Sequence, residues 1–281
     1  MEVKEINAKN IIVKSKLPSA DYVINPYTGC AFACIYCYAS FMGRFVNQTI
    51  ENWGNYVYVK INSIELFKNE INTFLKSKDN PSFLLSSVTD PYQGAEAKYK
   101  LTQGILEIIA QVQYKGQVGI LTKSPMVLRD IEILKRIPNA EVGMTITSTE
   151  DKVSKWAEIK APRISQRLEA LKTLKENGIK TYAFVGPIFP HYIKKLYEFE
   201  SIFQSLADIK VDSIFIEHIN LGKYILKRMT SQLAEENQEI KNVYQQATTK
   251  EHRLQLDEFC KEMIKKYGLN LRLSEVIYHK N

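Results

Sequence analysis

Three cysteines crowded into one short segment constrain this chain more than any other feature of its sequence. Residues 25–39 read NPYTGCAFACIYCYA, so Cys30, Cys34 and Cys37 are separated by three and then by two residues. Thiolates this close together can converge on a single inorganic centre, whereas a disulfide between such near neighbours would be strained and would leave the third thiol unused. The spacing therefore predicts a metal site.

The ligand count narrows the kind of metal. A structural zinc site takes four protein ligands, usually as two separated pairs, and neither a second cysteine pair nor an HxxxH sequence follows in this chain. A four-iron, four-sulfur (4Fe-4S) cluster held by three cysteines leaves one iron with an open coordination position, which can bind a ligand and take part in chemistry. The residues favour the cluster, with zinc or a chance grouping of cysteines as the alternatives.

Length and composition predict one globular domain. The chain has 281 residues, of which 45% are hydrophobic and 25% charged, which is ordinary for a soluble protein with one sizeable core. We expect a single domain over residues 1–281, with its core at about 21–220 and a C-terminal extension of helices and a strand at about 221–281. No segment reads as a signal peptide or a membrane span, and Cys260 has no obvious disulfide partner, so we expect a cytoplasmic protein without a membrane partner.

The net charge of +7 permits an anionic partner, such as nucleic acid or a phosphorylated metabolite. The 38 basic residues are spread along the whole chain and are mostly matched by 31 acidic ones, so solvated helix faces explain most of them. The charge alone identifies no partner.

Apolar runs that alternate with amphipathic segments predict a parallel α/β sheet. Main strands are expected at 22–25, 82–88, 117–122, 141–147, 179–185 and 211–217, and helices at 64–77, 98–114, 125–135, 163–177 and 191–208. An extended lead-in at 1–20, a strand at 56–60, a charged helix or helix pair at 231–266 and a closing strand at 270–277 complete the prediction. The choice is then between a doubly wound open sheet and a partial barrel, and a dinucleotide-binding half is unsupported because no GxGxxG opens the first βα turn.

Both architectures place functional groups at the carboxyl ends of the parallel strands. The polar or turn-forming residues found there, which we expect to face one cavity together with the cysteines, are Thr89, Asp90, Lys123, Thr145, Thr147, Pro187, Glu217, His218 and Asn220. Each also has an ordinary structural explanation. Asp90 before a proline can start a turn, Lys123 can head a loop before a helix, and a lone His218 between apolar neighbours is more often structural.

Several motifs, taken in order along the chain, resemble the spore photoproduct lyase-like branch of the radical S-adenosylmethionine (SAM) superfamily. They are NPYTGCxxxCxYCYA, TDPYQ, LTxxILE, LTKSxxxxRDxxxL, APxxxxRLxxLxxLxxxGI and PIxP, and they span about residues 21–190. The resemblance implies a partial (β/α)6 TIM-like barrel. It also implies an enzyme of lyase or of oxidoreductase or transferase type, in which a reduced 4Fe-4S cluster cleaves SAM to a 5′-deoxyadenosyl radical that abstracts hydrogen from a substrate.

The resemblance further implies roles for particular residues and an electron source. The iron ligands would be Cys30, Cys34 and Cys37, and the SAM contacts would be Tyr36, Thr89, Asp90, Lys123 and Thr145. Among these, Tyr36 would lie beside the adenine, and the compact ammonium of Lys123 would meet the SAM carboxylate. Arg167 would be either a ligand contact or a structural ion pair, and an external donor such as flavodoxin or ferredoxin would supply the electron.

Two departures from the family pattern concern the substrate. The lyase itself uses a cysteine near the end of its second strand as a hydrogen donor, but here that stretch reads LLSSVTDPYQ, and Cys260 lies in DEFCKEM, which is typical of helix packing. Repair of thymine dimers would therefore need another donor, such as a tyrosine. Beyond Pro190 the motifs fade, so the substrate could be a small molecule, a peptide or a nucleic acid. The alternatives are a nucleic-acid lesion repair lyase and a non-catalytic iron–sulfur or zinc protein.

Overall fold

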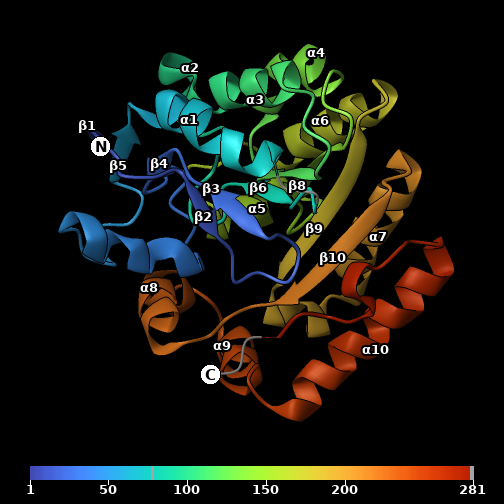
Figure 1. Cartoon of the computed structure of the whole chain (residues 1–281). Coiled ribbons are helices and arrows are strands. Elements are labelled where there is room, and N and C mark those ends of the chain that lie inside the picture. The colour runs from blue at the N-terminus through green and yellow to red at the C-terminus, as the bar shows by residue number, and fades with distance from the viewer. Residues whose placement is uncertain (77–78, 279–281) are drawn as a thin grey trace.

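The structure is a computed structural model, and it describes residues 1–76 and 79–278. Within these ranges the centre of the molecule is a sheet of seven strands (Figure 1). In order across the sheet they are β10 (Ser213–His218), β9 (Lys180–Ile188), β8 (Ala140–Thr145), β7 (Val118–Thr122), β6 (Phe83–Leu85), β3 (Tyr22–Ile24) and β2 (Ile12–Lys14). All neighbours pair in parallel except β2, which runs antiparallel to β3.

Helices lie between these strands along the chain, and the longer helices cover the outer face of the sheet (Figure 1). They are α1 (Ser63–Leu75), α2 (Gly94–Tyr99), α3 (Leu101–Gln111), α4 (Ile131–Leu134), α5 (Asp151–Ala157), α6 (Ile164–Glu176) and α7 (Leu196–Ile209). Apolar residues three and four positions apart form the buried face of each long helix, as Leu101, Ile105 and Ile109 do on α3. The alternation confirms the predicted parallel α/β fold, a partial (β/α)6 barrel.

A second, smaller sheet lies at the N-terminal side. Its order is β1 (Glu2–Ile6), β5 (Tyr56–Lys60) and β4 (Tyr27–Thr28), with β5 parallel to β1 and antiparallel to β4. The expected strand at 56–60 is therefore present, and part of the expected lead-in pairs with it. Because β4 runs directly into the cysteines, this sheet anchors the start of the segment that carries them.

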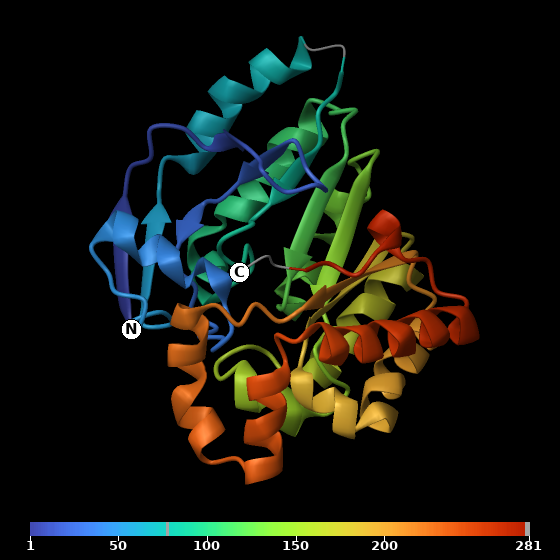
Figure 2. The same ribbon diagram turned by 90° about the horizontal axis from the view of Figure 1, so that it is seen from below.

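The C-terminal extension contains α8 (Lys223–Ala234), α9 (Gln238–Gln246) and α10 (Lys250–Tyr267). After α10 the chain turns back toward the strands in the middle of the molecule (Figure 2). The expectation of a closing strand at 270–277 is wrong as stated. Single parallel bridges join Leu271 to Ile214 and Ile277 to Glu217, and the short 3-10 helix η4 (Arg272–Ser274) interrupts the strand between them.

Other expected elements differ in their boundaries or type. The helix expected at 98–114 is divided at Lys100, which has φ +50°, and the one expected at 125–135 is the 3-10 helix η2 (Pro125–Asp130) followed by α4. Another 3-10 helix, η3 (Pro190–Lys194), precedes α7. Helices α5 and α8 were not predicted. Ser77, the expected end of the first helix, lies outside the described residues.

Candidate functional site

The three cysteines lie in a loop between β4 and the 3-10 helix η1 (Tyr38–Val46). Cys30 is 8% exposed, Cys34 is 6% exposed and Cys37 is partly buried. Their surroundings are largely apolar, since the cluster of packed side chains around them includes Phe32, Trp53, Tyr56, Tyr58 and Ala161. The loop therefore holds its thiols in a largely buried, apolar environment.

Gly29 allows the loop to pass close to the small sheet. Its φ is +88°, in the left-handed region that favours glycine, and a Cβ there would lie 2.5 Å from the carbonyl oxygen of Tyr56. Both the backbone conformation and the available space thus require glycine immediately before Cys30.

The TDPYQ motif braces the loop on both sides of Cys30. The Thr89 hydroxyl donates to the Gly29 carbonyl oxygen at 2.6 Å, and Gln93 Nε2 donates to the same oxygen at 3.1 Å. The Ala31 N–H in turn donates to Gln93 Oε1 at 2.9 Å. Gln93 is fully buried, and its role was not predicted although it belongs to the TDPYQ motif. In this structure Thr89 and Gln93 position the cysteine loop.

Asp90 joins the ends of two strands. Its Oδ1 accepts hydrogen bonds from the Thr122 hydroxyl at 2.7 Å and the Tyr92 N–H at 2.9 Å, while its Oδ2 accepts one from the Lys123 N–H at 2.8 Å. Burial raises the pKa of Asp90, and these hydrogen bonds oppose the rise. Asp90 thus fixes the backbone from which Lys123 extends.

Behind the cysteine loop lies a buried charge network centred on Glu158, which the sequence analysis did not identify. Glu158 is fully buried, forms an ion pair with Arg167 at 2.6 Å, and accepts a hydrogen bond from the Tyr36 hydroxyl. Lys123 Nζ lies 3.9 Å from Glu158 Oε1 and 5.7 Å from the centroid of the Tyr36 ring. The network brings Tyr36 and Lys123, two of the predicted site residues, into contact at the edge of the loop.

The backbone around Glu158 also pairs with the loop. Ile35 N–H donates to the Ala157 carbonyl at 2.9 Å, Lys160 N–H donates to the Phe32 carbonyl at 3.0 Å, and Cys34 and Glu158 face each other as an antiparallel bridge. This pairing places the Glu158 carboxylate directly beside Cys34.

The electrostatics of this region follow from burial and from the neighbouring charges. Burial alone would raise the pKa of Glu158, but Arg167 and Lys123 outweigh it and hold that pKa below its usual value. Burial alone would lower the pKa of Lys123, but Cys34 and Glu158 hold it above its usual value. Lys123 therefore carries a positive charge at the edge of the cysteine loop.

Burial raises the pKa of all three thiols, to about 12 for Cys34. Lys123 acts against this rise at Cys34 and at Cys37. A metal that binds thiolates must displace these protons, so its binding is coupled to their release.

Arg167 has the structural role that the sequence analysis left open. Besides its ion pair with Glu158, it donates from Nη2 to the Pro162 carbonyl at 2.8 Å and from Nη1 to the Thr145 carbonyl at 3.2 Å. Its side chain is 1% exposed. Thr145, which the sequence analysis predicted as a SAM contact, is buried at the carboxyl end of β8.

Arg228, on α8, holds the cysteine loop from the C-terminal extension and was also missed. Its guanidinium donates to the carbonyl oxygens of Cys34 at 3.0 Å, Ile35 at 3.3 Å and Ile50 at 2.6 Å. The signal for this role was absent from the sequence, because the partners lie nearly two hundred positions away along the chain. The extension is therefore part of the support of the site.

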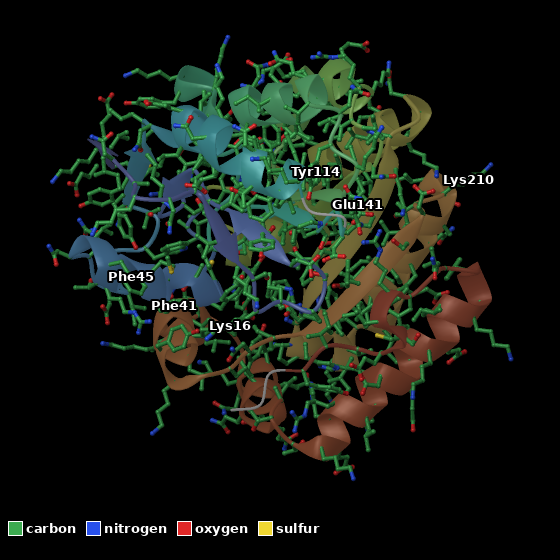
Figure 3. The ribbon with its side chains drawn as sticks, viewed as in Figure 1. Lys16, Phe41, Phe45, Tyr114, Glu141 and Lys210 are labelled. Carbon is green, nitrogen blue, oxygen red and sulfur yellow. The ribbon has the colours of Figure 1, made fainter. Side chains whose placement is uncertain are left out.

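Helix η1 carries the chain from Cys37 out to the surface. Its Phe45 is 64% exposed, and the Arg44 guanidinium lies 5.2 Å from the centroid of the Phe41 ring and 4.7 Å from that of Phe45. Figure 3 shows Phe41 and Phe45 on the side of the molecule where α8 lies. Phe41 and Phe45 thus form the outer end of the loop region.

Not all of the strand-end residues face one cavity, and that expectation is wrong for at least two of them. His218 Nε2 pairs with Asp257 of α10 at 2.8 Å, and the Asn220 side chain accepts a hydrogen bond from the Gly222 N–H at 2.9 Å within its own turn. Cys260 is fully buried in the core that α10 completes, as expected for helix packing.

Within the described ranges, no three His, Cys, Asp or Glu side chains converge closely enough to hold a single metal ion. An iron–sulfur cluster makes a different demand, because each thiolate binds its own iron atom and the sulfur atoms stay apart. Three thiols on one braced loop with apolar walls fit such a cluster. In the same part of the chain, no helix is long and apolar enough to cross a bilayer.

Comparison with known proteins defines the class. A family model described as the radical SAM superfamily matches residues 24–199, and the chain belongs to this superfamily. An uncharacterized protein of Methanocaldococcus jannaschii is 43% identical over 193 residues, which are 69% of this chain and 70% of that protein. A radical SAM Nα-GlyT isomerase of Pseudomonas phage M6 is 24% identical over 200 residues, which are 70% of this chain and 39% of that protein.

Among solved structures, spore photoproduct lyase in complex with dinucleoside spore photoproduct has the same fold. The TM-score is 0.75 at 17% identity, and the match covers 99% of this chain and 82% of that one. The predicted superfamily and the predicted lyase-like fold are confirmed. Membership of the radical SAM superfamily supports an enzymatic function. SAM and a 4Fe-4S cluster are general features of this family.

Proposed function

We propose that this protein is a radical SAM enzyme in which Cys30, Cys34 and Cys37 hold a 4Fe-4S cluster. The observation that carries the proposal is the cysteine loop itself, with three thiols on a rigidly braced segment beside a buried cation. When bound, the cluster and SAM would supply a 5′-deoxyadenosyl radical for hydrogen abstraction from the substrate. An external protein such as flavodoxin or ferredoxin would supply the electron.

Lys123 is the residue best suited to meet the SAM carboxylate. The single negative charge of Glu158 is shared between Arg167 at 2.6 Å and Lys123 at 3.9 Å, and Arg167 is the nearer partner. The Lys123 ammonium therefore keeps positive charge for an arriving carboxylate. We also propose that Tyr36 lies beside the adenine, and that Thr89, Asp90 and Thr145 border the ligand while supporting the loop and strand ends.

Iron content and SAM cleavage test the proposal directly. Anaerobically reconstituted protein should bind about four iron atoms per chain and release 5′-deoxyadenosine from SAM when a reductant is added. Cys34→Ala should abolish both properties, whereas the matched variant Cys260→Ala, which changes a cysteine in the core, should keep the iron. One zinc per chain without iron, or full cluster content in Cys34→Ala, would contradict the assignment.

We infer that the extension and the barrel core fold as one domain, because Arg228 of α8 binds three carbonyl groups of the core. Limited proteolysis between residues 218 and 223 offers a test. Cleaved halves that separate readily while the core keeps its iron would refute the single domain.

A nucleic-acid lyase is the second candidate. It is supported by the fold shared with spore photoproduct lyase, which was solved with a dinucleoside photoproduct. The stretch 84–93 contains no cysteine that could donate hydrogen, and Cys260 is fully buried. We therefore favour hydrogen abstraction from another substrate, whether a small molecule, a peptide or a different nucleic-acid target.

Irradiated DNA separates these two candidates. The reconstituted enzyme is incubated with SAM, reductant and the DNA, and both thymine recovery and 5′-deoxyadenosine are followed. Equal 5′-deoxyadenosine with and without DNA, and no thymine recovery, would support a different substrate. Stoichiometric recovery of thymine would establish the lyase.

A further inference from the structure

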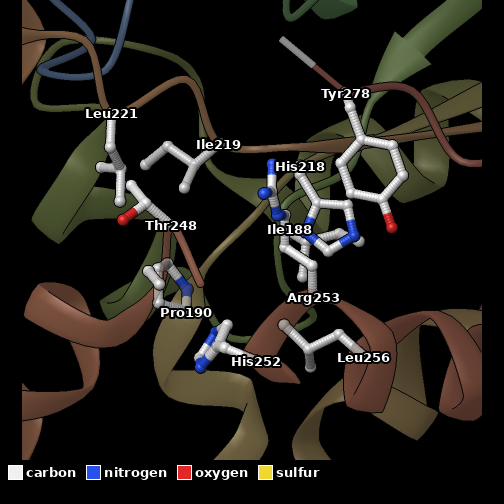
Figure 4. Close-up of a pocket in the computed structure, with 11 residues that line it drawn as sticks. Ile188, Pro190, His218, Ile219, Leu221, Thr248, His252, Arg253, Leu256 and Tyr278 are labelled. Atoms are coloured by element: carbon white, nitrogen blue, oxygen red, sulfur yellow. The ribbon is translucent and has the colours of Figure 1, made fainter. Parts of the chain in front are cut away.

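A hollow in the surface lies where α10 begins, near the ends of β9 and β10 (Figure 4). The empty space in this α10 pocket, including the part that is open to solvent, is about 390 Å³, and none of its lining residues belongs to the cysteine loop. The lining residues are Ile188, Pro190, His218, Ile219, Leu221, Ala247, Thr248, His252, Arg253, Leu256 and Tyr278.

The polar part of the α10 pocket is basic. His218, His252 and Arg253 line it, and no lining residue carries a carboxylate. The Arg253 guanidinium lies 5.3 Å from the centroid of the Tyr278 ring, and the His218 ring stacks on the same Tyr278 ring at 4.7 Å between centroids and 10° between planes. Tyr278 thus holds both the Arg253 and the His218 side chains at the pocket.

Asp257 fixes the protonation of one His218 nitrogen. It accepts a hydrogen bond from His218 Nε2 at 2.8 Å, and a carboxylate can only accept, so Nε2 carries the proton. The Asp257 carboxylate is not among the groups that line the pocket.

His252 supplies the observation that points to a ligand. It is 6% exposed, and its Nε2 is buried without a hydrogen-bond partner among the described residues. Leaving a buried polar atom unpaired is costly, so a partner from outside the chain would relieve that cost. Burial lowers the pKa of His252, so the ring is neutral and can donate a single N–H.

The pocket also lies at the start of an 18-residue helix. The Thr249 hydroxyl caps α10 by accepting from the His252 N–H at 3.3 Å, and the adjacent Thr248 lines the pocket. The free N–H groups and the dipole at a helix N-terminus favour a bound anion. Buried His252, Arg253 and the helix start thus offer donors to the same hollow.

We propose that the α10 pocket binds a phosphate group, either free phosphate or the phosphate ester of a small molecule. A phosphate has several oxygens that can accept from donors on different sides, and here the donors come from the first turn of α10 and from the end of β10. The apolar wall of Ile219, Leu221 and Leu256 would contact the organic part of an ester. The site is separate from the proposed cluster site and does not depend on SAM chemistry.

Binding of inorganic phosphate tests the proposal without SAM. Calorimetry on the reconstituted full chain should give a saturable isotherm, and Arg253→Gln should weaken it by about ten- to a hundredfold, the effect of losing one charge-assisted hydrogen bond. His252→Phe should weaken it as well. Lys261→Gln, which removes an exposed charge from the same helix outside the pocket, is the matched control and should bind as the unchanged protein does.

Histidine NMR provides a readout that a folding defect cannot imitate. The chain has four histidines, and phosphate should shift the ring signals of His252 and His218 but not that of His191, which lies outside the lining. Tighter binding of a nucleoside monophosphate than of inorganic phosphate would support an ester as the ligand, and equal binding would support free phosphate. No saturation, equal affinity in all variants, or an equal shift of His191 would overturn the proposal.

Discussion

Replacement of Glu158 by glutamine should show how much the charge network behind the cysteine loop contributes to stability. Arg167 lies 2.6 Å from Glu158 and its side chain is 1% exposed, so Glu158→Gln leaves a guanidinium without its counter-charge inside the protein. Breaking such a buried pair costs about 3–5 kcal/mol. For a chain of this size we expect the melting temperature to fall by roughly 6–20 °C, at about 2–4 °C per kcal/mol.

The assay is urea unfolding of cluster-free protein under anaerobic conditions, repeated after reconstitution. The matched control is Glu51→Gln, because Glu51 pairs with Lys227 at the surface, where the two side chains are 57% and 72% exposed. Loss of an exposed pair should cost much less, because water and salt already screen the interaction. Equal losses of unfolding free energy in the two variants would show that the buried pair does not stabilise the site.

The ion pair also predicts in which direction the stability contribution of Glu158 changes with pH. Arg167 and Lys123 hold the pKa of Glu158 below its ordinary value of 4.5 in the folded chain. A carboxylate with a lowered folded pKa contributes stability above its unfolded pKa and loses it as the pH falls through the folded value. The difference between the unchanged protein and Glu158→Gln should therefore be full at neutral pH and shrink below about pH 4.5. A difference that grows on acidification would refute this assignment of charges.

Three further variants test the loop and the ligand site. Lys123→Ala should weaken SAM binding by about ten- to a hundredfold with unchanged iron content, and unchanged affinity would leave Lys123 a purely structural role. Gly29→Ala should lower iron content after reconstitution, because its Cβ would clash at 2.5 Å, whereas Gly94→Ala, whose Cβ meets nothing within 4 Å, should not. Arg228→Gln should speed iron release to a chelator, since three carbonyl groups lose their donor, and Arg228→Lys should restore part of the protection; equal release rates would contradict this role.

Most of the fold could be predicted because the main strands are short buried runs between amphipathic helices. The expected strand at 82–88 is shorter in the structure, since β6 is Phe83–Leu85 and Ser86 turns the chain with φ +68°. Helix α8 was missed because it buries only Ile225 and Met229, which gives a weak apolar pattern. A local pattern predicts an element well when one face is strongly apolar, and poorly when the contacts are polar and distant.

The same limit explains which residues of the candidate site could be predicted from the sequence. Motif spacing predicted the three cysteines, and the resemblance of the motifs predicted Tyr36 and Lys123, because each of these residues lies within a few positions of another motif residue or of a strand end. Glu158 gave no local signal, since its hydrogen bond to Tyr36 joins residues 122 positions apart. A long-range ion pair depends on the fold and cannot be read from a short window of sequence.

The supports of the cysteine loop lead to a last prediction about the cluster-free protein. Thr89, Gln93 and Arg228 all bind backbone groups of the loop, so none of these contacts uses a thiol. The loop should therefore be ordered before any metal arrives, and the entropy of ordering it is a cost of folding rather than of cluster binding. The Ala31 amide, which donates to Gln93 Oε1 at 2.9 Å, should exchange slowly with deuterium even without iron. Gln93→Ala should make this amide exchange faster and weaken cluster retention, whereas an Ala31 amide that exchanges at the unprotected rate in the cluster-free protein would show that the metal, and not the fold, orders the loop.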